Sequence, residues 1–280
     1  MRIVKKASDL FDVRGYSVIV TGGASGLGLG YAEALAENGA CVTLFDVNPE
    51  RVRRESARLR GLGYDVEGRV LDITDHDALD RAFDEVVASR GRLDVVFANA
   101  GIDSGPGYLG AWVGSERPRL AEGALENYTD ERWNRTLDVN LNGAFVTLRA
   151  AARHMKPRHG GRIIVTSSQA ARRCEPAIGM AYMAAKAGLE HLVRNVALEL
   201  ATYNITVNAI APGMFATNIG GGHLMNPDAQ REVAKVIPMH RVGTPADMYG
   251  LALFLASPAS GYVTGQCIGI DGGFLLGAAD

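Results

Sequence analysis

The stretch Tyr16-Ser17-Val18-Ile19-Val20-Thr21-Gly22-Gly23-Ala24-Ser25-Gly26-Leu27-Gly28 decides the fold, because an apolar run breaks there into a glycine cluster. The apolar run predicts a buried strand, and Leu27 to Asn38 predicts the helix that follows it. Gly22, Gly26 and Gly28 would let the backbone turn sharply and approach a diphosphate, whose charge the free N–H groups at the helix start would meet. The stretch therefore predicts a nucleotide site, while a glycine-rich turn of this spacing can also be purely structural.

The composition is that of a chain that forms one compact domain. Its 280 residues are 47% hydrophobic, its net charge is −2, and its Lys and Arg residues are scattered along the chain. The electrostatic footprint of a nucleic-acid-binding protein is therefore absent, and no apolar run reaches the roughly 18 residues of a membrane span. We expect a soluble cytoplasmic protein that binds a small molecule and has neither a nucleic-acid nor a membrane partner.

The cysteines give no sign of a structural role. Cys41, Cys174 and Cys267 are far apart in the sequence and odd in number. This pattern favours neither a disulfide framework nor a metal site. Cys41 and Cys267 lie in strand-like runs and are expected in the core, whereas Cys174 lies in a polar loop where it is open to oxidation.

Strand-like and helical patterns alternate along the chain after a lead-in over residues 1–15. Further strands are predicted over residues 41–46, 65–71, 93–98, 162–166, 205–211 and 267–270. Helices are predicted from Pro49, after Asp75, and over residues 130–155, 181–202 and 244–255. The alternation predicts an α/β fold for the single domain 1–280, a Rossmann-type doubly wound parallel sheet with helices on both faces.

Two segments interrupt this alternation. Residues 103–127 are long for a connection in a compact domain, which indicates a functional or mobile loop. Residues 214–241 carry enough apolar side chains for a substrate lid, although the same side chains can equally pack the lid's own helices. Ligands of a doubly wound sheet lie beyond the carboxyl ends of its strands, so we expect both segments to meet the glycine cluster there.

Asp46 ends the strand after the glycine turn, about 20 residues downstream of it. A carboxylate at this place accepts hydrogen bonds from the 2′-hydroxyl of an adenosine ribose and repels a 2′-phosphate, so it predicts NAD rather than NADP. Alternatively, Asp46 caps the turn at Asn48-Pro49. Arg51 and Arg53 nearby keep the choice of cofactor open.

Tyr182 and Lys186 lie four residues apart at the start of a predicted helix, so their side chains share one face. Ser167 and Ser168 end the preceding strand and place hydroxyls at the same sheet edge. A tyrosine that carries a proton near neutral pH needs its pKa lowered by about three units, which a neighbouring ammonium and a cationic nicotinamide together supply. The Tyr-x3-Lys spacing alone also occurs by chance on many helices.

Several short motifs follow one another along the chain. They are Thr21-Gly22-x3-Gly26-x-Gly28, Asn99-Ala100-Gly101, Asn140, Ser168, Tyr182-x3-Lys186, Pro212-Gly213-x3-Thr217 and Asp271-Gly272-Gly273. In this order they resemble the short-chain dehydrogenase/reductase family, and the match covers about Phe11 to Phe274. The resemblance also implies a homotetramer, in which the helices 130–155 and 181–202 pair between subunits and the C-terminal segment lies at another interface.

The resemblance implies a role in catalysis for four residues. Tyr182 would be the base in alcohol oxidation and the acid in carbonyl reduction. Lys186 would lower the pKa of this tyrosine and hold the nicotinamide ribose. Ser168 would hydrogen-bond the substrate oxygen, and Asn140 would keep a water molecule in the proton relay.

The resemblance also implies the contacts of the cofactor. Asp72, with Ile73 beside it, resembles the adenine contact, and Asn99 would steady the sheet edge. Phe215 and Thr217 would meet the nicotinamide carboxamide. The other predicted cofactor contacts are Gly22, Ser25, Gly26, Leu27, Gly28, Asp46, Ala100, Gly101, Tyr182, Lys186, Pro212 and Gly213, and no metal site is predicted.

Two features depart from the family's pattern. The family usually separates the serine and the tyrosine by 13 positions, which would select Gln169, whereas Ser168 lies 14 positions before Tyr182. We keep Ser168, because it follows the strand directly, and expect one extra residue in the loop 172–179. The other departure is the long segment 103–127, where a short connection is usual. Its polar and aromatic residues would roof the pocket, bind an anionic substrate or pack at a subunit contact; they are Tyr108, Trp112, Arg117 and Arg119.

Together these features predict an NAD-dependent alcohol dehydrogenase or ketoreductase that moves hydride between a nicotinamide and a secondary alcohol or ketone. The apolar segment 214–241 favours a hydrophobic or cyclic substrate. The alternative within enzymes is an NADPH-dependent 3-oxoacyl-thioester reductase. A protein of another class, an NAD(H)-binding sensor or scaffold, would not need the complete proton-relay set.

Overall fold

A seven-stranded parallel sheet forms the centre of the protein in the computed structural model, which describes residues 6–110 and 117–277. The strand order is β3-β2-β1-β4-β5-β6-β7. The strands are β1 Ser17–Thr21, β2 Cys41–Asp46, β3 Val66–Val70, β4 Val95–Ala98, β5 Gly161–Thr166, β6 Ile205–Pro212 and β7 Cys267–Ile270. The inner strands β1, β4 and β6 are buried along their whole length, as expected for a parallel sheet that is covered on both faces.

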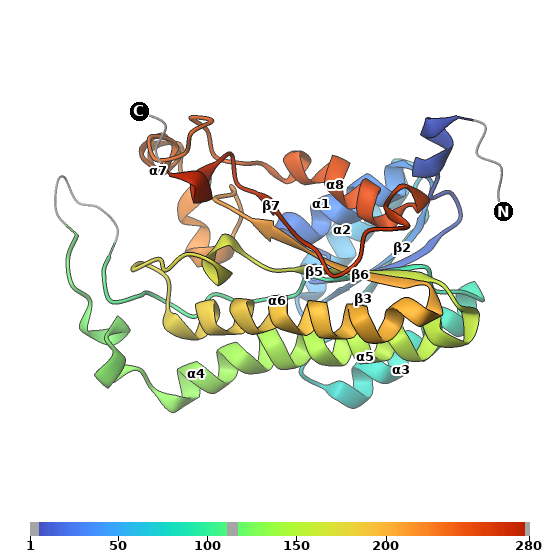
Figure 1. Cartoon of the computed structure of the whole chain (residues 1–280), viewed down its shortest axis with the longest axis horizontal. Helices are drawn as coiled ribbons and strands as arrows, with labels where there is room; N and C mark the ends of the chain where they lie inside the picture. Colours follow the sequence, from blue (N-terminus) through green and yellow to red (C-terminus); the bar gives the residue numbers. More distant parts are fainter. Residues whose placement is uncertain (1–5, 111–116, 278–280) are drawn as a thin grey trace.

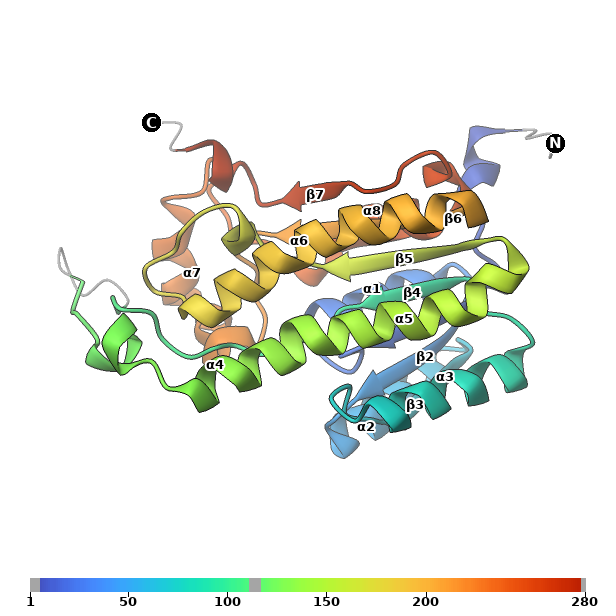
Figure 2. The ribbon, with the colours of Figure 1, turned by 60° about the horizontal axis from the view of Figure 1, so that its bottom comes forward.

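Helices cover both faces of this sheet (Figure 1). One face carries α1 Gly26–Glu37, α2 Pro49–Gly61 and α8 Tyr249–Ala256; the other carries α3 His76–Arg90, α5 Ala144–Met155 and α6 Met180–Leu200. Figure 2 shows α3, α5 and α6 side by side in front of the strands. Each face has its own apolar core cluster. The predicted doubly wound α/β fold is therefore confirmed. In the described part of the chain, no helix combines the length and the apolar character needed to cross a membrane.

Side-chain caps fix where two of these helices begin. Asn48 accepts a hydrogen bond from the backbone N–H of Arg51 at 2.9 Å, and Asp75 accepts one from Ala78 at 3.0 Å. Such caps satisfy N–H groups that have no partner within the helix. They place the start of α2 directly after the predicted ribose contact, Asp46.

The helix predicted over residues 130–155 is helical throughout but has an irregular centre. It consists of α4 Asp130–Leu137, a π-helical turn Asp138–Gly143, and α5. The π turn contains the predicted relay residue Asn140, which is fully buried. Single π turns inside α-helices frequently occur at functional sites, and the apolar spacing in the sequence does not reveal them.

The described part of segment 103–127 folds back on the loop before α6. Gly107 and Leu109 donate backbone hydrogen bonds to the carbonyls of Ala177 and Pro176, at 2.9 and 3.1 Å. The segment also pairs with itself, because Gly110 donates to Pro118 at 2.8 Å. This ladder attaches the segment to the loop that leads into the tyrosine helix.

Residues 214–241 contain one short helix, α7 Pro227–Ala234, after a 3-10 segment Ile219–Met225. Three consecutive glycines inside that segment have positive φ angles of 64°, 69° and 75°. This backbone conformation is open to glycine at little cost, and other residues rarely adopt it. The segment therefore contains a turn that the sequence Gly220-Gly221-Gly222 makes possible.

Candidate active site

A large cavity of about 2420 Å³ lies beyond the carboxyl ends of the strands. The strand order reverses between β1 and β4, and this is the place where doubly wound sheets bind their ligands. Every predicted catalytic or cofactor residue except Gly28 lines the cavity. These are Gly22, Ser25, Gly26, Leu27, Asp46, Asp72, Ile73, Asn99, Ala100, Gly101, Asn140, Ser168, Tyr182, Lys186, Pro212, Gly213, Phe215 and Thr217.

The glycine turn supplies a cradle that side chains would fill. Gly22 and Gly26 have φ angles of 62° and 53°, which glycine adopts without strain. Gly28 is buried behind the turn, where an added Cβ would overlap the carbonyl oxygen of Gly22 and the side-chain nitrogen of Asn99. Gly28 therefore allows α1 to lie against the turn, and the other two glycines face the cavity. A turn of this shape at a helix start fits a diphosphate.

Asn99 joins the ends of three strands. Its side-chain nitrogen donates to the carbonyls of Thr21 and Gly22 at 3.0 and 3.3 Å, and its side-chain oxygen accepts from Thr166 at 3.0 Å. These bonds connect β1, β4 and β5 at the sheet edge. The floor of the cavity is therefore rigid at the point where the glycine turn begins.

The Asp46 carboxylate faces the cavity and is only 8% exposed. It accepts hydrogen bonds from the backbone N–H groups of Ala24 and Asn48, at 3.2 and 3.1 Å. Asp46 therefore caps the turn at Asn48 and also faces the cavity. These two roles are compatible, because each carboxylate oxygen keeps a second lone pair that can accept from a ribose hydroxyl.

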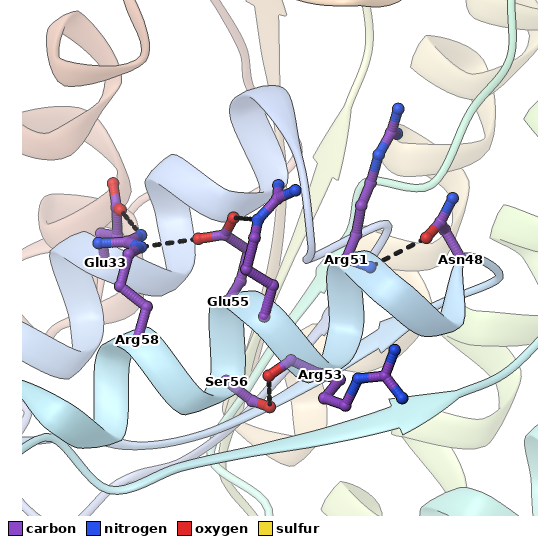
Figure 3. A network of polar contacts seen from close by, with 8 residues as sticks. Glu33, Asn48, Arg51, Arg53, Glu55, Ser56 and Arg58 are labelled. Atoms are coloured by element: carbon purple, nitrogen blue, oxygen red, sulfur yellow. Dashed lines mark hydrogen bonds and ion pairs between the residues drawn. The ribbon is translucent and has the colours of Figure 1, made fainter.

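Arg51 lines the same end of the cavity as Asp46. In Figure 3 its guanidinium extends away from α2 without an ion pair, and only its backbone N–H is bonded, to Asn48. Arg58, by contrast, is held between Glu33 and Glu55. Because Arg51 has no carboxylate partner among residues 6–110 and 117–277, it offers a positive charge at the same end of the cavity as Asp46.

Asp72 and Ile73 follow β3 on the opposite wall of this end of the cavity. Asp72 accepts two hydrogen bonds from Thr74, from its backbone N–H at 2.9 Å and its hydroxyl at 2.8 Å. Ile73 is 5% exposed, and its side chain lies so close to Gly143 that a Cβ there would be 2.5 Å away. The π turn and the end of β3 are therefore in contact.

Ser168, Tyr182 and Lys186 converge at the other end of the cavity. Ser168 lies shortly after the end of β5, directly before the 3-10 turn Gln169–Ala171. Helix α6 carries the tyrosine and the lysine on one face. The Lys186 Nζ lies 5.5 Å from the centroid of the Tyr182 ring and donates a hydrogen bond to the carbonyl of Thr166 at 2.7 Å. The three groups that the sequence predicts to act in proton transfer, a hydroxyl, a phenol and an ammonium, are thus brought together.

Burial sets the ionisation of these groups in the chain alone. It raises the pKa of Tyr182 to about 12, a rise that the negative charge of Asp103 increases and the Ser168 hydroxyl opposes. Burial also lowers the pKa of Lys186 to about 8. In the chain alone, desolvation therefore dominates the pKa of Tyr182. The lowering of this pKa by Lys186 and a bound nicotinamide together stays a prediction.

Asn140 uses its side chain to hold the backbone after β4. Its oxygen accepts from the N–H of Ile102 at 3.2 Å, and its nitrogen donates to the carbonyls of Ile102 and Thr136, each at 3.0 Å. An added Cβ on Gly101 would be 2.7 Å from this oxygen. The oxygen keeps a second lone pair, which is what a water-holding role would use.

The loop after β6 closes the cavity on the side of the lid. Phe215 and Thr217 are 6% and 7% exposed, and both line the cavity. Thr217 lies opposite the glycine turn, since an added Cβ on Gly26 would be 3.6 Å from its Cβ. The two segments that were predicted to converge on one ligand therefore face each other.

Sequence reasoning missed three polar residues at the substrate end. Asp103, Gln169 and Glu175 line the cavity around Ser168 and Tyr182. Burial raises the pKa of both carboxyl groups. Backbone hydrogen bonds from Ser104 and Gly105, and then the charge of Arg132, oppose the rise at Asp103. The charges of Arg173 and Arg117 oppose it at Glu175. The only signal in the sequence was the 13-residue spacing, which pointed to Gln169.

The segment 103–127 contributes to the cavity wall in part. Of its predicted roof residues, Arg117 lines the cavity, and its Nε donates to the carbonyl of Gly110 at 3.2 Å. Tyr108 and Arg119 lie outside the cavity lining, and Trp112 falls outside the described residues.

Comparisons with known proteins agree with this geometry. The family model described as Enoyl-(Acyl carrier protein) reductase matches residues 22–275. The 3-oxoacyl-(acyl-carrier-protein) reductase FabG of Chlamydia pneumoniae is 33% identical over 263 residues, covering 92% of this chain and 96% of that protein. The galactitol 2-dehydrogenase of Rhizobium johnstonii is 35% identical over 269 residues, covering 94% and 96%.

A solved structure shows the same fold. It is a gluconate 5-dehydrogenase from Burkholderia cenocepacia J2315 in complex with NADP and tartrate. Its TM-score is 0.84 at 31% identity, and the match covers 97% of this chain and 99% of that one. Since the family model and these relatives span nearly the whole chain, the protein belongs to the short-chain dehydrogenase/reductase family of nucleotide-binding oxidoreductases.

Proposed function

We propose that the protein transfers a hydride between a nicotinamide cofactor and a secondary alcohol or ketone. The observation that carries this proposal is the convergence of Ser168, Tyr182 and Lys186 at one end of a cavity whose other end carries the glycine turn and Asp46. The bound nicotinamide supplies the hydride, and the chain supplies binding, orientation and proton transfer.

In this mechanism the Tyr182 hydroxyl gives its proton to the oxygen of a ketone, or takes one from an alcohol. The Ser168 hydroxyl hydrogen-bonds the same substrate oxygen and fixes its position. Lys186, held by the Thr166 carbonyl, keeps its ammonium beside the phenol. A positive charge there stabilises the phenolate that forms when the tyrosine donates.

Replacement of the tyrosine tests the proposal. Tyr182→Phe should lower kcat by roughly 10²- to 10⁴-fold, the usual contribution of a general acid, and leave the affinity for NADH within about threefold. Tyr203→Phe is the matched control, because Tyr203 follows α6 and lies outside the cavity lining. Full activity of Tyr182→Phe would show that another group transfers the proton.

We propose NAD as the preferred cofactor. The support is Asp46, whose nearly buried carboxylate faces the cavity where a 2′-phosphate would have to sit. Arg51, at the same end, supports the alternative, an NADPH-dependent 3-oxoacyl-thioester reductase. The catalytic efficiencies with NADH and NADPH distinguish the two, and a strong preference for NADPH would contradict the role of Asp46.

We propose a hydrophobic or cyclic carbon skeleton as the substrate, because the segment 214–241 offers it an apolar surface. Apolar side chains of residues 214–241 face the cavity; they are Phe215, Ile219, Leu224, Val233 and Val236. Other apolar residues of the same segment pack within it, such as Ile237, which is 2% exposed. The apolar side chains that face the cavity support the role of a lid, and those that pack within the segment support its own folding.

We also propose that the protein is a cytoplasmic homotetramer that uses α4, α5 and α6 as one interface and the C-terminal segment as another. Exposed apolar side chains support this: Phe145 on α5 is 46% exposed, Leu198 on α6 is 81% exposed, and Leu276 near the C-terminus is 91% exposed. Light scattering coupled to gel filtration measures the assembly, and Leu198→Glu should weaken it. A monomer at micromolar concentration would contradict the proposal.

A further inference from the structure

The side chain of Gln169 is an unpaired amide in the wall of the cavity. Gln169 directly follows Ser168, is 2% exposed and lines the cavity. Its side-chain oxygen is buried without a hydrogen-bond partner, and the amide makes no hydrogen bond with any described residue. The oxygen lies beside the loop after β6, since an added Cβ on Gly213 would be 3.3 Å from it.

An unpaired buried amide is costly, because folding removes its hydrogen bonds to water without replacing them. Most buried side-chain polar groups have a partner, so an exception that lines a cavity calls for a physical explanation. The partner of Gln169 would therefore arrive with the substrate. A hydroxyl group suits either orientation of the amide, because it donates to the oxygen and accepts from the nitrogen.

Two carboxylates also line the cavity. The side chain of Glu175 is 14% exposed; it lies 3.1 Å from the Arg173 guanidinium, yet its Oε1 is buried without a hydrogen bond. Asp103 lines the cavity close to Tyr182, on the side of segment 103–127. An acyl chain against this wall would leave the Gln169 oxygen without a partner, whereas a hydroxyl group would satisfy it.

We infer that Gln169 recognises a hydroxyl group near the reacting carbon, so that the substrate is a hydroxyketone or polyol. The inference rests on the proposed hydride transfer and names the substrate class of the same site. One side of the substrate would present its C–H groups to the apolar lid, and the other side would present its hydroxyls to Gln169 and the carboxylates. Gln169 is a specificity-determining residue in this account, and the proton-transfer groups remain those named above.

Matched pairs of ketones with and without a neighbouring hydroxyl test the inference. Cyclohexanone is compared with 2-hydroxycyclohexanone, and 2-butanone with 1-hydroxy-2-butanone, by NADH and NADPH oxidation. The unaltered protein should prefer each hydroxyketone by at least roughly tenfold in kcat/KM. Gln169→Leu should lower that preference by roughly tenfold, mostly through a higher KM for the hydroxyketone. A neutral ketohexose and a keto-aldonate, run in parallel, tell whether a carboxylate on the substrate adds to recognition.

Two further variants keep the result interpretable. Gln266→Leu makes the same change at an exposed residue outside the cavity lining, and it should leave the preference unchanged. Gln169→Asn keeps the amide but shortens its reach, and it should give an intermediate preference even if Gln169→Leu folds poorly. Equal losses on both members of a pair, or no preference in the unaltered protein, would overturn the inference alone. Absence of turnover on every ketone with both cofactors would overturn the proposed function as well.

Discussion

The Lys186 ammonium is 2.7 Å from the carbonyl oxygen of Thr166, to which it donates a hydrogen bond across the end of β5. Lys186 is 3% exposed and has no carboxylate partner among the described residues. The bond fixes the lysine beneath Tyr182 and ties α6 to the sheet. Burying a charged ammonium with only one carbonyl as a hydrogen-bond partner costs free energy. The protonation of Lys186 is therefore coupled to the free energy of unfolding.

This coupling predicts a rise in stability with pH. The pKa of Lys186 is about 8 in the folded chain and 10.5 ordinarily, so the unfolded chain binds more protons between these values. Unfolding free energy should therefore increase by up to about 3 kcal/mol from pH 8 toward pH 10.5. Urea unfolding at pH 7.5 and 9.5 measures this increase.

Lys186→Met should remove this rise, so its unfolding free energy should not increase from pH 7.5 to pH 9.5. The raised pKa of Tyr182, about 12, acts in the opposite direction, but only above pH 10, where the unfolded chain loses the phenolic proton first. Burial raises the pKa of Cys267 to about 12, so this thiol lowers the stability as the pH rises above its ordinary value of 9. A variant with the same pH slope as the unaltered protein would show that other groups cause it.

A second prediction concerns Asp103, whose negative charge raises the pKa of Tyr182. Asp103→Asn removes this charge, so the pKa that limits kcat/KM for alcohol oxidation at low pH should fall by roughly half a pH unit. Asp138→Asn is the control, since Asp138 also lines the cavity without acting on the tyrosine. The prediction would be contradicted if kcat/KM depended on pH in the same way for Asp103→Asn and for the unaltered protein.

The strands and helices could be predicted from the sequence, because each element buries its apolar side chains against the sheet or its helices. This burial gives the sequence a periodicity that is typical of a strand or of a helix. Residues 41–46 and 267–270 were placed without error, and Asp75 caps its helix as expected. Motif residues also converge, since strands that run parallel end at one edge. What periodicity cannot show is the π turn around Asn140, because it changes the hydrogen-bonding pattern and leaves the apolar spacing unchanged.

The polar wall of the substrate end was beyond the reach of the sequence for a different reason. Asp103 follows β4, and Gln169 and Glu175 lie in the loop after β5. These loops meet at one cavity only when the chain is folded. The spacing of their residues along the sequence gives no indication that they share it. The desolvation that raises the pKa of Tyr182 in the chain alone was also beyond the sequence, because it depends on packing.

A third prediction separates the two cofactors. Asp46→Ser removes the charge that repels a 2′-phosphate, so the ratio of kcat/KM for NADPH to that for NADH should rise by at least roughly tenfold. Arg51→Gln should move the ratio in the opposite direction. Arg53→Gln is the control, because Arg53 leaves α2 in another direction and lies outside the cavity lining (Figure 3). A ratio unaffected by Asp46→Ser would place the adenosine ribose elsewhere.

A fourth prediction concerns the attachment of segment 103–127. The Arg132 guanidinium donates to the carbonyls of Ser104, Pro106 and Glu122 and stacks on the Tyr128 ring at 4.2 Å. A lysine cannot reproduce the planar set of guanidinium donors that bonds these three carbonyls. Arg132→Lys should therefore lower the free energy of unfolding by about 1–3 kcal/mol. It should also raise KM for the substrate more than KM for the cofactor.

The matched change Arg81→Lys, at an exposed position on α3, should leave both quantities unaltered. Limited proteolysis locates the effect, since Arg132→Lys should expose segment 103–127 to cleavage first. Cleavage that begins elsewhere, with unaltered KM values, would contradict the role of Arg132.

The last prediction returns to the glycine turn. Ala at position 28 would place a Cβ against the carbonyl oxygen of Gly22 and the side-chain nitrogen of Asn99, neither of which can move without breaking the bonds that join β1 to β4. Gly28→Ala should therefore cost about 1–3 kcal/mol of unfolding free energy and weaken NADH binding by more than roughly tenfold. Gly250→Ala is the contrasting variant, because Gly250 lies in α8 with open space around it. It should stabilise the chain by about 0.5–1 kcal/mol and leave binding unchanged. Equal effects of the two substitutions would mean that helix α1 does not press on the turn as the structure describes.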